Sequence, residues 1–175
     1  MSANIVQSGI EPDLMQLIPG YNGYESPAQR VRSDKHFREY LAGYIQHIVI
    51  GFGKIESRLS ENDVETAKAI QKIIRQLTQV TDAMQSPAYM GSEFFHSPRI
   101  DGAMLAELHE TDTRIYDDIH YIASEVAFLE QGWDTEDATT FLGFLFDAID
   151  SLNHSLVERE FLLIEPVDES PIATL

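Results

Sequence analysis

Residues 26–60 read SPAQRVRSDKHFREYLAGYIQHIVIGFGKIESRLS, and this stretch decides the fold class. Its apolar residues recur at steps of three and four, which places them on one face of an α-helix. The members of this apolar face are Leu41, Ile45, Ile48, Phe52, Ile55 and Leu59. At the start of the stretch, Ser26 can serve as the N-cap, Pro27 as the first helical residue and Gln29 as the capping-box partner. We therefore predict a helix from Pro27 to Ser60.

Three more stretches have the same helical periodicity. The second helix follows Asp63 as a predicted N-cap, ends before Pro87, and has an apolar face of Ile70, Ile73, Leu77, Val80 and Met84. The third runs from Asp101 to Gly132, with a face of Leu105, Leu108, Asp112, Ile115, Ile119, Ile122, Val126 and Leu129. The fourth starts at Asp134, with Leu142, Leu145, Ile149, Leu152 and Leu156 facing inward.

Four amphipathic helices of this length predict an all-α fold. With short connections, the expected packing is an up-and-down antiparallel bundle of four main helices, preceded by a short N-terminal helix or clasp. The 175 residues are enough for one domain, so we expect a single helical-bundle domain over residues 1–175. Residues 1–9 and 167–175 have the composition of mobile tails. Residues 86–101 form the longest predicted loop.

The charge of the chain limits its partners. The net charge is −17, and residues 86–175 contribute most of it, with three basic and nineteen acidic residues. Such a surface repels nucleic acid and anionic lipid. Solubility, a basic protein partner and loose binding of divalent cations are all compatible with it. No basic and apolar leader is found at the N-terminus and no apolar stretch is long enough to span a bilayer, so we expect no membrane insertion and a cytoplasmic location.

The opening motif, LIPGYNGYESPAQRVRSDKHFREYL at residues 17–41, precedes and enters the first long helix. Its Pro and Gly residues allow tight turns, after which Tyr21 and Tyr24 can fold back as a clasp over one end of the core. Arg30, Asp34 and Arg38 are spaced by four, so they form a ladder along one helical face. Aromatic anchors beside guanidinium groups are also the usual chemistry of protein-binding surfaces.

The predicted loop at 86–101 is rich in aromatic residues for a connection. Tyr89, Phe94 and Phe95 can plug one end of the bundle, or they can form an exposed apolar patch of the kind that marks interfaces. We include them, with the opening motif, as candidate interaction residues.

Two sets of motifs together resemble a family of uncharacterised bacterial helical proteins. The first is IPGYNGY followed by Arg30, Asp34, Lys35 and Arg38, and the second comprises Arg75, Asp82, AYMGSEFF and LAELHETDTRIYDDI. The resemblance covers roughly residues 15–130. It implies a protein that works beside an SPFH/band-7 (flotillin-like) membrane protein, and it supplies no established activity for this chain.

A histidine in the first long helix offers an alternative function. His47 precedes Gly51 and Gly53, and histidine-phosphotransfer domains are likewise four-helix bundles with a small residue four positions after the acceptor. Those domains carry a lysine just before that glycine. Here Ile50 holds the position, although Lys54 could substitute from the same face. The other interpretation is that the glycines permit close helix packing, with His47 as a hydrogen-bonded residue between helices.

Metal binding is the third hypothesis. Di-iron bundles need an acid-x-x-His pattern on two helices, and this chain has it once, in Asp117-Asp118-Ile119-His120. The remaining candidates, Asp150 and His154, lie with Asp147 and Glu158 on the face of the fourth helix opposite its apolar residues. A solvated charged face explains that pattern better than a metal site does, and we expect no cofactor.

Asp112 interrupts the apolar face of the third helix. A buried carboxylate needs a partner, and we expect Arg30, Arg38 or Lys72 to supply it. Serine-hydrolase, P-loop and dinucleotide-binding motifs are not found in the sequence. The sequence therefore favours a non-enzymatic protein–protein interaction or scaffold protein without catalytic residues, with a protein partner and homo-oligomerisation open to it.

Overall fold

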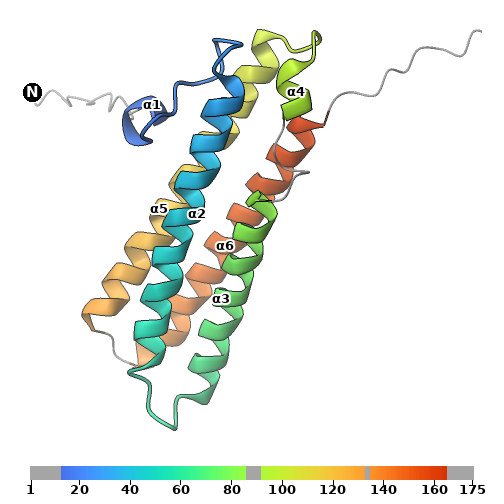
Figure 1. The fold of residues 1–175 in the computed structure, drawn as a ribbon. Coiled ribbons are helices and arrows are strands. Elements are labelled where there is room, and N and C mark those ends of the chain that lie inside the picture. The colour runs from blue at the N-terminus through green and yellow to red at the C-terminus, as the bar shows by residue number, and fades with distance from the viewer. Residues whose placement is uncertain (1–12, 86–91, 133–134, 165–175) are drawn as a thin grey trace, which may run out of the picture.

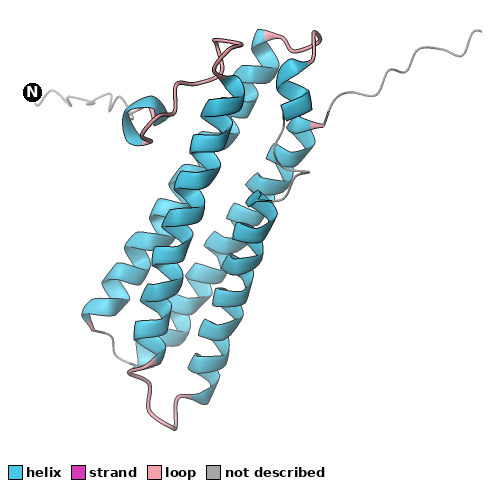
Figure 2. Cartoon of the chain, viewed as in Figure 1, coloured by secondary structure: helices cyan, strands magenta, loops and turns pink. Residues whose placement is uncertain are grey.

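The computed structural model describes residues 13–85, 92–132 and 135–164. These residues form two short and four long helices and contain no strand (Figures 1 and 2). The helices are α1 (Leu14–Leu17), α2 (Arg30–Glu56), α3 (Val64–Gln85), α4 (Ser92–His96), α5 (Gly102–Gln131) and α6 (Thr135–Leu163). The long helices α2, α3, α5 and α6 pack as an up-and-down bundle, which confirms the predicted fold class.

The core of the bundle consists of the predicted apolar faces. On α2, the predicted residues from Leu41 to Ile55 are buried. The helix itself is shorter than predicted, because Ser26 to Gln29 form a turn in which the Gln29 amide donates to the Ser26 carbonyl oxygen (2.9 Å). Gln29 is the N-cap and makes no side-chain capping bond, so the predicted capping box is wrong. Leu59 lies beyond the end of α2 and is half-buried.

Asp63, the predicted N-cap of the second long helix, lies directly before α3, but its carboxylate accepts hydrogen bonds from the connection between α2 and α3. Asp63 Oδ2 accepts hydrogen bonds from the Ser60 amide (2.9 Å) and the Ser60 hydroxyl (2.7 Å). These bonds fix the turn and lower the pKa of Asp63. On α3, the predicted apolar face from Ile70 to Met84 is buried.

The predicted loop between the second and third long helices contains the short helix α4. Phe94 and Phe95 are buried in it, and their rings are 5.3 Å apart in an edge-to-face arrangement. Helix α4 contacts α2, and the Phe95 ring stacks on that of Tyr24 (5.3 Å between centroids), close to the start of α2. The two phenylalanines therefore plug this end of the bundle. Tyr89 lies outside the described residues.

Helix α5 begins and ends as predicted. The Asp101 carboxylate accepts from the Met104 amide (2.9 Å), and Gly132 ends the helix with a φ of 137°, which favours glycine. Asp134 lies outside the described residues.

Three pairs of side chains define the antiparallel register between α5 and α6. Arg114 contacts Glu158 (2.9 Å), Ser151 donates to Asp118 (3.3 Å), and the rings of Phe128 and Phe141 stack at 5.8 Å. The start of α5 therefore lies against the end of α6. None of the described helices is long and apolar enough to cross a bilayer.

Candidate functional site

The opening motif forms a compact corner between α1 and α2. Gly20 (φ 82°) and Gly23 (φ 68°) adopt left-handed conformations, and this turns Tyr21 and Tyr24 into the bundle, where both are buried. Arg30 holds the corner from the first turn of α2, because its Nε donates to the Tyr24 carbonyl oxygen (2.7 Å). These contacts agree with the predicted clasp.

A buried ionic network lies beneath this corner. The fully buried Arg159 of α6 donates from Nε to Asp112 Oδ1 (2.6 Å) and from Nη2 to Asp34 Oδ1 (2.7 Å). Asp34 also accepts from Arg38 Nε (2.9 Å), and Tyr24 donates its hydroxyl proton to Asp112 Oδ2 (2.5 Å). Two guanidinium groups thus face two carboxylates, and α2, α5, α6 and the corner are joined at one point.

The network perturbs its titratable members. Burial raises the pKa of Asp112, and the Arg159 guanidinium and the Tyr24 hydroxyl oppose this rise. Burial raises the pKa of Tyr24 well above its usual range, and the nearby Asp112 charge adds to the effect. The tyrosine therefore remains a hydrogen-bond donor to the carboxylate at neutral pH. Because Asp34, Asp112 and Arg159 are fully buried, the arrangement is suited to holding the bundle together.

The ion partner of Asp112 differs from the prediction. Neither Arg30, Arg38 nor Lys72 pairs with it, since Arg30 holds the corner, Arg38 pairs with Asp34, and Lys72 lies over the Phe146 ring (4.8 Å). The partner, Arg159, was missed although the sequence contains a signal. Arg159 follows Leu156 by three residues, so it lies on the apolar face of the fourth helix.

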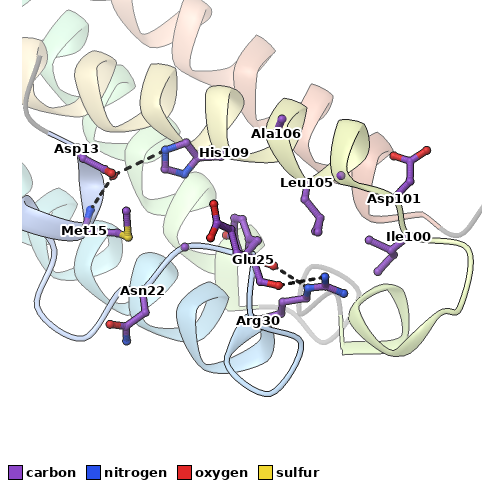
Figure 3. A pocket seen from close by; sticks show the side chains of 13 residues that line it. Asp13, Met15, Asn22, Glu25, Arg30, Ile100, Asp101, Leu105, Ala106 and His109 are labelled. Carbon is purple, nitrogen blue, oxygen red and sulfur yellow. Dashed lines mark hydrogen bonds and ion pairs between the residues drawn. The ribbon is translucent and has the colours of Figure 1, made fainter. Parts of the chain in front are cut away.

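A pocket of about 630 Å³ lies outside the network, between the corner and the start of α5 (Figure 3). His109 is on its wall, with Nδ1 2.9 Å from the Tyr21 hydroxyl and Nε2 3.8 Å from Asp13 Oδ1. Two other charged lining residues are engaged, since Asp101 caps α5 and Arg30 holds the corner. Glu25 also lines the pocket and is an exposed residue.

Most of the candidate interaction residues lie inside the protein rather than on its surface. A surface role requires exposed side chains, but most of the set is buried, namely Tyr21, Tyr24, Asp34, Arg38, Phe94 and Phe95. Arg30 is half-buried. The left-handed glycines allow Tyr21 and Tyr24 to pack inward, while Asp34 and Arg38 are held in the buried ionic network. In the bundle, the six buried side chains pack against other parts of the protein.

His47 is exposed on α2, and one of its ring nitrogens is engaged. Nδ1 lies 2.9 Å from the Gly43 carbonyl oxygen, which can only accept, so Nδ1 carries the proton. Gly51 permits close packing with α5, because an added Cβ would lie 2.7 Å from Val126 Cγ1. The expected lysine substitute, Lys54, is paired with Glu130 (3.1 Å).

The metal candidates do not converge. No group of three or more histidine, aspartate or glutamate side chains within the described residues could hold an ion. Asp117, Asp150 and His154 are exposed. His120 instead belongs to an aromatic stack with Tyr44 (4.2 Å between centroids) and Tyr116 (4.0 Å).

Partial burial perturbs the rings of this stack. It raises the pKa of Tyr116 to about 12, and it lowers the pKa of His120. The His120 imidazole is therefore uncharged at neutral pH, which suits a ring that packs against tyrosines.

An exposed aromatic face on α5 and α6 was not anticipated from the sequence. Tyr121, Phe128 and Phe144 are 48%, 59% and 57% exposed, respectively. Tyr121 and Phe128 are seven residues apart and so lie on one side of α5, and Phe128 stacks on Phe141, one turn before Phe144. We call Tyr121, Phe128, Phe141 and Phe144 the aromatic face.

In the comparisons with known proteins, no family model, curated protein or solved structure matches this chain. The resemblance to the family with the IPGY-x-GY corner remains a prediction that these comparisons do not test.

Proposed function

We propose that this protein is a non-enzymatic protein-binding bundle, and that the aromatic face is its contact surface. The observation that carries the proposal is the exposure of Tyr121, Phe128 and Phe144 on one side of the molecule. Single exposed apolar residues are common, but aromatic rings grouped on one face are typical of protein interfaces.

The buried network supports this proposal by giving the face a fixed scaffold. Arg159 and Asp112 join α6 to α5 at one end, and the Phe128–Phe141 stack joins them at the other. The partner therefore meets two helices whose relative position is already set, which reduces the entropy lost on binding. A cytoplasmic protein beside an SPFH/band-7 membrane complex is the setting that the family resemblance suggests for this proposal.

The proposal is tested by affinity capture from the native cells followed by native mass spectrometry. The test variant replaces Tyr121, Phe128 and Phe144 with serine. The control variant replaces Ile50 and Val64 with serine, because these residues are similarly exposed, at 58% and 51%, but lie on α2 and α3. We expect a stoichiometric protein partner with the wild type and the control, and none with the test variant. Capture of the same partner by all three proteins would reject the aromatic face.

His47 supports a second candidate function, phosphoryl transfer. With the proton on Nδ1, its Nε2 carries the lone pair and is the nucleophilic nitrogen, on an exposed side chain. A receiver domain or a phosphorylated histidine kinase would be the donor class, and the phosphoryl group would pass from its aspartate or histidine to Nε2.

This second candidate has its own test. The protein would be incubated with a small-molecule phosphoryl donor such as acetyl phosphate, and intact mass would be measured before and after acid treatment. We expect an acid-labile phosphate in the wild type but not in His47→Gln. If His47→Gln gains the acid-labile phosphate equally, phosphoryl transfer at this position is excluded.

A further inference from the structure

We infer that the partner of the aromatic face is a basic amphipathic helix, an inference that rests on the proposed function. Two observations are combined here, the geometry of the exposed rings and the distribution of charge around them. Each observation limits the occupant in a different way.

The geometry suits a helix lying along α5 and α6. Tyr121 and Phe128 are two turns apart, which corresponds to about 10 Å along the α5 axis. The antiparallel register places Phe144 of α6 at the level of the α5 turn that contains Glu125. Anchors at positions i, i+3 or i+4, and i+7 of a partner helix span the same distance, as in helix-in-groove recognition.

Negative charge dominates the part of the chain that carries these rings. The sequence from residue 115 to residue 158 contains no lysine or arginine but ten aspartate and glutamate residues. The arginines at either side are both committed, Arg114 to Glu158 (2.9 Å) and Arg159 to the buried network. Asp117, Asp147 and Asp150 are exposed. A partner that covers the rings must therefore bring positive charge to the rim.

Other occupants fit less well. A second copy of this chain would bring a further net charge of −17 to an acidic surface. An anionic bilayer would be repelled for the same reason. A helix with leucine-like anchors on one side and lysine or arginine on the flanks satisfies both the rings and the carboxylates, and electrostatic attraction would accelerate its association.

The test uses a synthetic helix of roughly 18 residues made from leucine and lysine in an amphipathic pattern. Its control is an isomer of the same composition with the pattern scrambled. Fluorescence anisotropy with a labelled peptide measures the dissociation constant. We expect the wild type to bind the amphipathic peptide at least about tenfold more tightly than the isomer, and more weakly at high salt.

Variants locate the binding. The double variant Phe128→Ser and Phe144→Ser should lose about tenfold or more in affinity, while Ile50→Ser with Val64→Ser should lose none. Changes in ¹⁵N NMR shifts of the wild type on adding peptide should cluster around Tyr121 and Phe128, a result that does not depend on any variant folding.

Several outcomes would overturn the inference. The inference is wrong if the wild type binds the two peptide isomers equally, or if the double variant keeps its affinity while the NMR changes lie elsewhere. It is also wrong if the wild type self-associates and the double variant does not, or if the protein floats with phosphatidylserine vesicles. Suppose that the native partner requires the aromatic face but the leucine–lysine peptide does not bind. The proposed function would then stand and only the basic helix would be wrong. If the aromatic-face variants keep both the native partner and the peptide, the proposed function and the basic helix are both rejected.

Discussion

Replacing Arg159 with methionine tests the role of the buried network. Methionine fills a similar volume without charge, so the substitution removes the guanidinium and leaves the surrounding packing close to intact. Asp112 loses its ionic partner, while Asp34 keeps Arg38 at 2.9 Å. The variant therefore leaves one carboxylate, that of Asp112, buried without its cation.

The expected loss in the free energy of unfolding is about 3–5 kcal/mol at neutral pH, the usual cost of removing one partner from a buried ion pair. The hydrogen bonds give a similar value, since the two short bonds from Arg159 to Asp112 and Asp34 contribute roughly 1.5–3 kcal/mol each. Adding Asp112→Leu to Arg159→Met should recover much of this loss, because no buried charge is then left at that position.

The loss should depend on pH. Without Arg159, burial is the dominant influence on Asp112, so the folded-state pKa rises further above the unfolded value of about 3.9. A carboxyl group with a raised folded pKa favours the folded state below the unfolded pKa, and this contribution disappears as the pH rises through the folded pKa. The variant should therefore differ less from the wild type at about pH 5 than at about pH 8. Urea unfolding followed by far-UV circular dichroism measures both differences.

The control for this experiment is Arg114→Met. Arg114 joins the same two helices through Glu158, but its side chain is 47% exposed and that of Glu158 is 42% exposed. An exposed pair is worth about 0–1 kcal/mol. If Arg159→Met costs no more than Arg114→Met, or if its cost grows as the pH falls, the role assigned to the network is wrong.

Three smaller predictions concern single positions. Thermal unfolding should show that Gly51→Ala lowers the free energy of unfolding by about 1–3 kcal/mol, because the added Cβ overpacks the contact with α5. Gly53→Ala should raise it by about 0.5–1 kcal/mol, because no atom lies within 4 Å of the added Cβ. Equal effects of the two substitutions would refute the close contact at Gly51. Tyr24→Phe should cost about 1–3 kcal/mol in urea unfolding, because Asp112 loses a donor, and a neutral result would count against that bond. Asp101→Ala should cost about 1 kcal/mol, against Asp101→Asn as the capping control.

The helical core could be predicted from the sequence because it depends on local periodicity. The inward residues of α2, from Leu41 to Ile55, follow directly from steps of three and four. The cap of α5 at Asp101 and its end at Gly132 were also predicted, because a side chain and a backbone conformation within a few residues determine them. The start of α2 was missed because the turn at Ser26 satisfies the same local pattern with a different hydrogen bond.

The candidate site could be predicted only in part, because its contacts join distant residues. That Asp112 needed a cation follows from its place on an apolar face, but the choice of Arg159 depends on how α5 and α6 pair. The inward direction of the corner likewise depends on tertiary packing around Tyr24. The exposure of Phe128 and Phe144 could not be known until the bundle showed which faces remained uncovered.

The contact between Tyr24 and Arg159 also orders events during synthesis. The two residues are 135 positions apart, so the tyrosine is made long before the arginine. At about 5–20 residues per second, a ribosome needs roughly 7–27 s to cover that distance. Throughout that interval the corner has Arg30 but not Arg159, and the contact between Tyr24 and Arg159 forms only after α6 has left the exit tunnel. Helix α6 therefore completes a contact with a corner that was translated long before it.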